Sequence, residues 1–169
     1  MKVLLFVLVF GACVSCFSKD VDLKGATLLF SIDEKKVTGT ASGDNYSFRF
    51  KDGKAFTLSP IPNVKPEMMD AIIREATEEI KNDIKKKKTP NLMVKSYTVH
   101  SSTLGIFVGK EAAITTVRSS PNSDIKYIQC MYIFLLWDGK MCWKGAYSCA
   151  VKGEMGAVHN ILKTGKRIK

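Results

Sequence analysis

The chain begins with an unbroken apolar run, from Val3 to Phe10, that follows a single lysine, Lys2. Small residues occupy most of the next stretch, between Gly11 and Cys16, and the chain then turns polar. A positive start, a short apolar core and a small-residue exit are typical of a secretory signal. The run is too short to span a bilayer, which requires about 20 apolar residues. The alternative is a buried N-terminal strand, but no polar residues alternate with the apolar ones as a half-buried strand requires.

Two cysteines near the end of this signal, Cys13 and Cys16, are candidates for lipidation. The sequence around Cys16 resembles a bacterial lipoprotein signal, in which the cysteine is acylated and becomes the first mature residue. In the usual pattern a leucine lies three residues before that cysteine. Here Cys13 lies three residues before Cys16, and Phe10 lies three residues before Cys13. Ordinary cleavage near residues 15–17 is the alternative. We expect residues 1–16 to be removed or acylated, and the protein to be secreted or held at the cell envelope.

Strand-like alternation dominates the segment after a short polar lead over residues 17–25. Tyr46–Phe50 alternates aromatic and polar residues, which is the period of a half-buried strand. Asp52-Gly53 has the chemistry of a tight hairpin turn, because both residues tolerate positive φ angles. Further strands are predicted over residues 26–32, 37–41 and 55–58.

The pattern becomes helical from about Pro66 to Lys87. Acidic residues gather towards the start and lysines close the end, an arrangement that the helix dipole favours. Thr89-Pro90 ends the helix. The apolar residues recur at spacings of three and four, so they share one face: Met69, Ile72, Ile73, Ala76, Ile80 and Ile84.

Strands return in the second half, over residues 92–100, 104–108 and 112–117, with a turn expected at Gly109–Glu111. Tyr127–Trp137 is nearly all apolar, so we expect this strand to be covered on both faces. Asp138-Gly139-Lys140 turns it back into a partner strand over residues 141–151. A helix over residues 154–163 and a basic tail close the chain.

Hairpins thus dominate, and no alternation of parallel strands with helices is visible. The predicted fold is α+β, an antiparallel β-sheet with one long helix and a C-terminal helix packed against it. A length of 169 residues suits a single domain, which we place at residues 26–169.

The chain is strongly basic, with a formal net charge of +10 that falls by one when Lys2 is removed. Such an excess favours anionic partners. We expect an anionic membrane surface or an unidentified acidic protein, and no nucleic acid; solubility alone would explain the charge equally well. The candidate basic patch combines the end of the long helix with the C-terminal tail: Lys85, Lys86, Lys87, Lys88, Lys163, Lys166, Arg167 and Lys169.

The three cysteines outside the signal leave room for one disulfide at most. If the turn after Trp137 has two residues, Cys130 faces Tyr147 and lies diagonal to Cys149. If it has four, Cys130 faces Cys149 directly, and a disulfide between them is sterically allowed. Two buried thiols are the alternative, and Cys142 is expected to be unpaired in either case.

Catalytic motifs are missing from the sequence. His100 and His159 are the only histidines, and neither has a carboxylate or cysteine at metal-ligand spacing. There is no Gly-x-Ser-x-Gly elbow, P-loop or dinucleotide fingerprint, so no cofactor and no small-molecule substrate are predicted. We therefore expect a non-catalytic binding or accessory protein rather than an enzyme. The alternative is a small secreted hydrolase whose site is assembled from scattered residues such as His100, Ser101 and Glu111.

The layout from Tyr46 onward resembles the PsbP-like or MOG-type α/β/α sandwich, which includes the extrinsic photosystem II protein and many small bacterial lipoproteins. The matching features are the aromatic strand at Tyr46–Phe50, the long helix, the restart at Pro90–Val94, the turn into a strand at Gly109–Ala113, the long apolar hairpin and the closing helix. A fainter resemblance, through Val37–Ala41 and Phe50–Gly53, is to META-type β domains. The first resemblance implies a binding or assembly role and carries over no catalytic residue.

Overall fold

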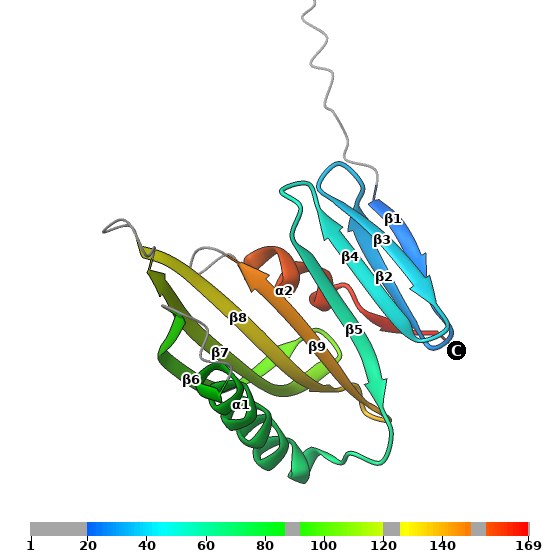
Figure 1. Ribbon diagram of the computed structural model, residues 1–169. Coiled ribbons are helices and arrows are strands. Elements are labelled where there is room, and N and C mark those ends of the chain that lie inside the picture. Colours follow the sequence, from blue (N-terminus) through cyan, green and yellow to red (C-terminus); the bar gives the residue numbers. More distant parts are fainter. Residues whose placement is uncertain (1–19, 87–91, 120–125, 150–154, 169) are drawn as a thin grey trace, which may run out of the picture.

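The computed structural model describes residues 20–86, 92–119, 126–149 and 155–168, and it has the predicted α+β fold (Figure 1). The helices are the short 3₁₀ turn η1 (Pro66–Met68), α1 (Met69–Lys86) and α2 (Gly156–Lys163). The strands are β1 (Asp20–Lys24), β2 (Leu28–Asp33), β3 (Val37–Ser42), β4 (Asn45–Phe50), β5 (Ala55–Ile61), β6 (Leu92–Leu104), β7 (Phe107–Ser119), β8 (Lys126–Trp137), β9 (Cys142–Cys149) and β10 (Lys166–Arg167).

The strands form two antiparallel sheets instead of the one expected from the sequence. A seven-stranded sheet has the order β3-β4-β5-β9-β8-β7-β6, and a three-stranded sheet has the order β1-β2-β10. Two segments predicted to lie outside the sheet are therefore strands. Part of the polar lead forms β1, which pairs with β2, and part of the basic tail forms β10 on the other side of β2.

Helix α1 covers one face of the large sheet, over β6, β7 and β8 (Figure 1). Met69 and Ile73 are buried there against Ala112 and Leu135. The other four residues of the predicted apolar face are only half-buried. Thr77, which the apolar pattern missed, is fully buried, because its hydroxyl donates to the Ile73 carbonyl oxygen at 2.6 Å and so loses no hydrogen bond.

The opposite face of the large sheet packs on α2 and on the small sheet. Phe30 of β2 stacks on Phe107 at a centroid distance of 6.2 Å and meets Phe48 edge-on at 5.5 Å. Thr164, at the end of α2, accepts a hydrogen bond from the Ser31 amide at 3.1 Å and donates to the Ser31 carbonyl oxygen at 3.0 Å. These contacts join the small sheet to the large sheet and to the end of α2.

The turn between β6 and β7 lies at Gly105-Ile106 and not, as predicted, at Gly109–Glu111. Gly105 has a φ of 63°, and a side chain there would lie 2.7 Å from the carbonyl oxygen of Lys163. Glycine is therefore required at residue 105 both for the turn and for the close approach of α2. With the turn at Gly105-Ile106, both strands are longer than predicted, and Glu111 lies opposite His100.

Candidate functional site

The structure does not bring the two halves of the predicted basic patch together. Lys85 and Lys86 lie at the end of α1, beside β6, whereas Lys163 and Lys166 lie near the C-terminus, beside β2, on the other side of the molecule (Figure 1). Lys87, Lys88 and Lys169 lie outside the described residues, as do the lipidation candidates Cys13 and Cys16.

Arg167, another member of that patch, has an internal partner. Its guanidinium donates to Asp138 Oδ1 at 2.9 Å, and the Asp138 side chain is completely buried. The same carboxylate accepts from the amides of Lys140 and Met141 and from Trp143 Nε1, each at 2.9 Å. We assign Arg167 a structural role, because it neutralises a buried charge that closes the β8–β9 turn.

A different basic surface lies where β6 begins, β7 ends and β8 begins; we call it the basic sheet end. Cross-strand pairing aligns Leu92 with Arg118 and Tyr127, and the next row aligns Met93 with Val117 and Ile128. Five exposed cationic side chains gather on it and on the adjoining end of α1: Lys85, Lys86, Lys95, Arg118 and Lys126. In the described chain β6 and β8 contain no acidic residue, and the single acidic residue of β7 is buried.

Large apolar side chains are exposed at the same sheet end. Met93 is 63% exposed, Tyr127 60% and Ile128 48%. The sequence predicted that Tyr127–Trp137 would be covered on both faces, and this is wrong for residues 127–129, which are exposed. Tyr127 and Ile128 follow one another along the strand, so apolar surface is exposed on both faces of the sheet.

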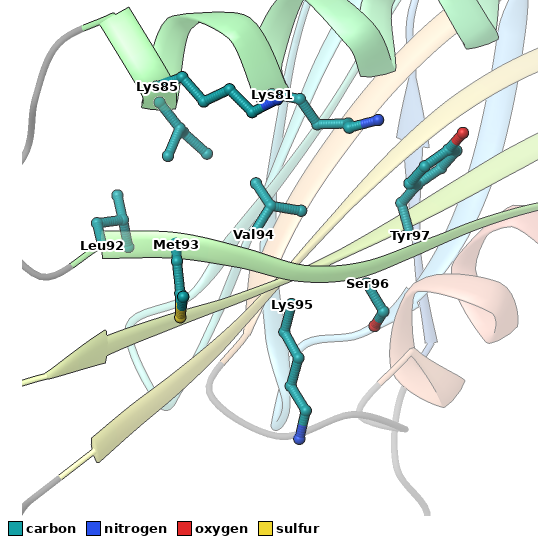
Figure 2. A pocket seen from close by; sticks show the side chains of 9 residues that line it. Lys81, Lys85, Leu92, Met93, Val94, Lys95, Ser96 and Tyr97 are labelled. Atoms are coloured by element: carbon teal, nitrogen blue, oxygen red, sulfur yellow. The ribbon is translucent and has the colours of Figure 1, made fainter.

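A groove runs between the last turns of α1 and the first half of β6, next to the basic sheet end (Figure 2). Its volume is about 440 Å³. Lys81 Nζ lies 4.3 Å from the centre of the Tyr97 ring and donates to Glu78 Oε1 at 2.7 Å. The hydrogen bond that Lys81 donates to Glu78 raises the pKa of Lys81, so the ammonium stays charged. The remaining lining combines two further lysines with apolar and small side chains: Ile84, Lys85, Leu92, Met93, Val94, Lys95 and Ser96.

Both histidines meet one buried carboxylate, which sequence spacing did not reveal. His100 Nε2 lies 3.3 Å and His159 Nε2 3.1 Å from Glu111 Oε2. Glu111 is only 1% exposed, and its Oε1 is buried without a hydrogen-bond partner among the described residues. His100 is 52% exposed and His159 28%, and each has a carboxylate partner that is distant in the sequence.

Ser101 is not part of this cluster. It pairs with Lys110, whose Nζ lies 3.3 Å from the Ser101 hydroxyl and the same distance from Asp70 Oδ1 on α1. Since side chains alternate along a strand, Ser101 lies on the α1 face, whereas His100 and Glu111 lie on the α2 face. Of the three scattered residues considered for a hydrolase, the structure therefore brings together two. Among the described residues, no group of three metal-binding side chains is arranged to hold an ion.

The β8–β9 register resolves the alternatives for the cysteines. Trp137 pairs with Cys142, so the turn has four residues and Cys130 faces Cys149. The structure holds Cys130 as a buried thiol, so the disulfide stays a prediction for oxidising conditions. Cys142 is also a buried thiol, and burial raises its pKa, which makes the reactive thiolate scarce.

Comparison with known proteins identifies the fold only. No family model and no curated protein matches the chain. A crystal structure of a protein from Bacteroides thetaiotaomicron VPI-5482 is similar, with a TM-score of 0.50 and 10% sequence identity. The match covers 87% of this chain and 50% of that one, so the chain spans about half the length of that structure. Within the described ranges, no helix has the length and apolar character needed to cross a membrane.

Proposed function

We propose that this chain is an exported, non-catalytic accessory protein that binds an anionic membrane surface through the basic sheet end. The observation that carries the proposal is the mixture of residues there. Lys95, Arg118 and Lys126 are exposed beside Tyr127 and Ile128. The export signal predicted at residues 1–16 supports a location at the outer side of a membrane.

The two kinds of side chain favour a membrane for different physical reasons. A basic residue near an anionic bilayer contributes about 1 kcal/mol, and this attraction is screened by salt. Tyrosine sits well at the membrane interface, because its ring is apolar and its hydroxyl stays hydrated. Lysine side chains lay their methylenes on apolar surface while the ammonium stays in water. An acidic protein would satisfy the charges but would not require exposed apolar residues on both faces of a sheet end.

Vesicle co-sedimentation of the full chain tests the proposal, with phosphatidylcholine vesicles that contain or lack phosphatidylglycerol. Any acyl group or apolar leader acts equally on both vesicle types, so their difference isolates the charge effect. Lys95→Glu with Lys126→Glu should weaken binding to the anionic vesicles by at least about 30-fold, since two attractions of about 1 kcal/mol are lost.

The matched control is Lys140→Glu with Lys144→Glu, which changes the net charge equally. Both control residues are exposed, and Lys140 lies in the turn at the far end of β8. Strand β8 has 12 residues, so its two ends are roughly 35–40 Å apart. Equal binding to both vesicle types, or equal loss in the control, would refute the proposal. Binding to an acidic protein but not to vesicles would show that the basic sheet end binds a protein partner instead of a membrane.

One contact, between His100 and Glu111, favours a hydrolase as a second candidate function. A buried carboxylate that holds a half-exposed imidazole, as Glu111 holds His100, is the arrangement that orients a general base. Replacing His100 with glutamine should then abolish turnover of simple ester substrates. Turnover that is absent from the natural chain, or unchanged in the variant, would exclude this use of the dyad.

A further inference from the structure

We propose that the groove between α1 and β6 holds the phosphate-bearing head group of one phospholipid, a lipid subsite within the basic sheet end. The inference rests on the proposed membrane binding and adds a specific pocket to it. The groove lies between the end of α1 and the start of β6, and Lys85 of the helix and Leu92 of the strand both line it (Figure 2). A bilayer that lies against the basic sheet end would therefore reach the groove.

The cationic side of the groove is preorganised. Lys81 is fixed by its hydrogen bond to Glu78 and by its position over the Tyr97 ring. An ammonium has three donors, so Lys81 retains hydrogen bonds for an anion after it has satisfied Glu78. Because the side chain is already held, little rotamer entropy is lost when it binds a ligand.

Lys85 supplies a second ammonium on the same side of the groove. It lies four residues after Lys81 in α1, so the two side chains lie on one helix face, about 5–6 Å apart at their Cβ atoms. Both extend over β6 from the helix in Figure 2. Two lysines at this spacing match a group with several anionic oxygens, and lysine binds phosphate as a point charge.

The apolar side of the groove indicates that the phosphate is attached to a lipid. Ile84, Leu92 and Val94 line it next to the lysines. The glycerol and the first methylenes of an acyl chain would remove these side chains from water, which a free phosphate would not do. Phosphate ester chemistry is shared by lipids and by soluble metabolites, so the experiment must separate the two sources.

Binding of monomeric dihexanoyl phosphatidylglycerol to the full chain tests the subsite, by titration followed through the NMR signals of the Tyr97 ring. We expect saturable binding, with glycerol phosphate and inorganic phosphate much weaker. Lys85→Met should lower the affinity about tenfold, the usual effect of losing one charge-assisted hydrogen bond. Lys81→Met should lower it at least as much.

Lys126→Met is the matched control. Lys126 is exposed at the same sheet end, at the start of β8, and it is not among the residues that line the groove. Lys95, which lines the groove, extends from the other side of β6, away from Lys81 and Lys85 (Figure 2), and is left unchanged. The control should weaken vesicle binding as Lys85→Met does and leave monomeric lipid binding unchanged. An equal loss in Lys126→Met, or phosphate binding as tight as lipid binding, would overturn the lipid subsite. Vesicle binding without monomer binding would overturn the subsite alone, and monomer binding without vesicle binding would refute the proposed function alone.

Discussion

Replacing Asp138 with asparagine should destabilise the fold by about 3 kcal/mol, because this carboxylate satisfies several buried donors at once. Asparagine keeps an oxygen for the Lys140 and Met141 amides, which donate to Oδ1. It loses the charge that pairs with Arg167, whose side chain is 25% exposed. It also places an NH₂ group against Trp143 Nε1, a donor against a donor. Breaking one partner of a buried ion pair costs about 3–5 kcal/mol, and we take the low end because Arg167 keeps some water.

Urea denaturation of the natural chain, Asp138→Asn, Trp143→Phe and the double variant measures this effect and separates its parts. Phenylalanine removes the indole donor, so in the Trp143→Phe background Asp138→Asn should cost about 1 kcal/mol less. A loss below about 1 kcal/mol in Asp138→Asn alone would show that the carboxylate is not the organising group of the β8–β9 turn.

The pH dependence gives an independent check on the same residue. Burial acts to raise the pKa of Asp138, but the hydrogen bonds from Arg167, the two amides and Trp143 outweigh it, and the net shift is downward from the ordinary 3.8. A carboxyl whose pKa is lower in the folded state stabilises the fold above its unfolded pKa, and this stabilisation is lost as the pH falls through the folded pKa. The difference in unfolding free energy between the natural chain and Asp138→Asn should therefore be full at neutral pH and shrink below about pH 4.

Three further outcomes are expected. Ile73→Ala should lower the unfolding free energy by about 2–5 kcal/mol and Ile80→Ala by less than half of that, in urea titrations, because Ile73 is fully buried under α1 and Ile80 is half-buried. Alkylation of Cys142 by iodoacetamide should be slow in the folded chain and fast in urea, since burial raises its pKa; fast labelling of the folded chain would contradict the described environment. Intact mass of the protein from an exporting cell should show loss of residues 1–16 or a diacylglycerol on Cys16 or Cys13, and an unprocessed Met1 start would contradict export.

The elements that sequence analysis predicted well are those in which one face is buried. Tyr46–Phe50 alternates in the sequence as it alternates in burial. The helix predicted from about Pro66 to Lys87 is found as the 3₁₀ turn Pro66–Met68 followed directly by α1, Met69–Lys86. Strand β1 was missed although Val21 and Leu23 alternate with charged residues, because a segment of mostly charged residues after a signal suggests a linker. In the structure β1 pairs with β2, and β2 contributes the buried apolar residues of this pair of strands.

The His100–Glu111–His159 cluster could not be predicted from spacing. His159 and Glu111 are 48 positions apart, and His100 faces Glu111 only because the β6–β7 turn lies at Gly105. With the turn placed at Gly109, Glu111 falls into a loop and no partner is visible. Two glycines in one hairpin offer two registers, and the choice depends on the contact between Gly105 and the end of α2, which is a tertiary interaction.

Where the charges lie on the fold matters more for binding than the net charge of +10. At the far end of β8 the charge of Arg167 is cancelled by Asp138, and in the turn between β2 and β3 Lys36 lies 3.2 Å from Asp33. Among the described residues Lys140 and Lys144 at the far end of β8 form no ion pair, and the same holds for Lys95 and Lys126 at the basic sheet end. A field produced by a few unneutralised side chains is local and decays within a Debye length, about 10 Å at moderate salt. Charge reversal at that end should therefore alter membrane binding much more than the same change elsewhere, which net charge alone does not predict.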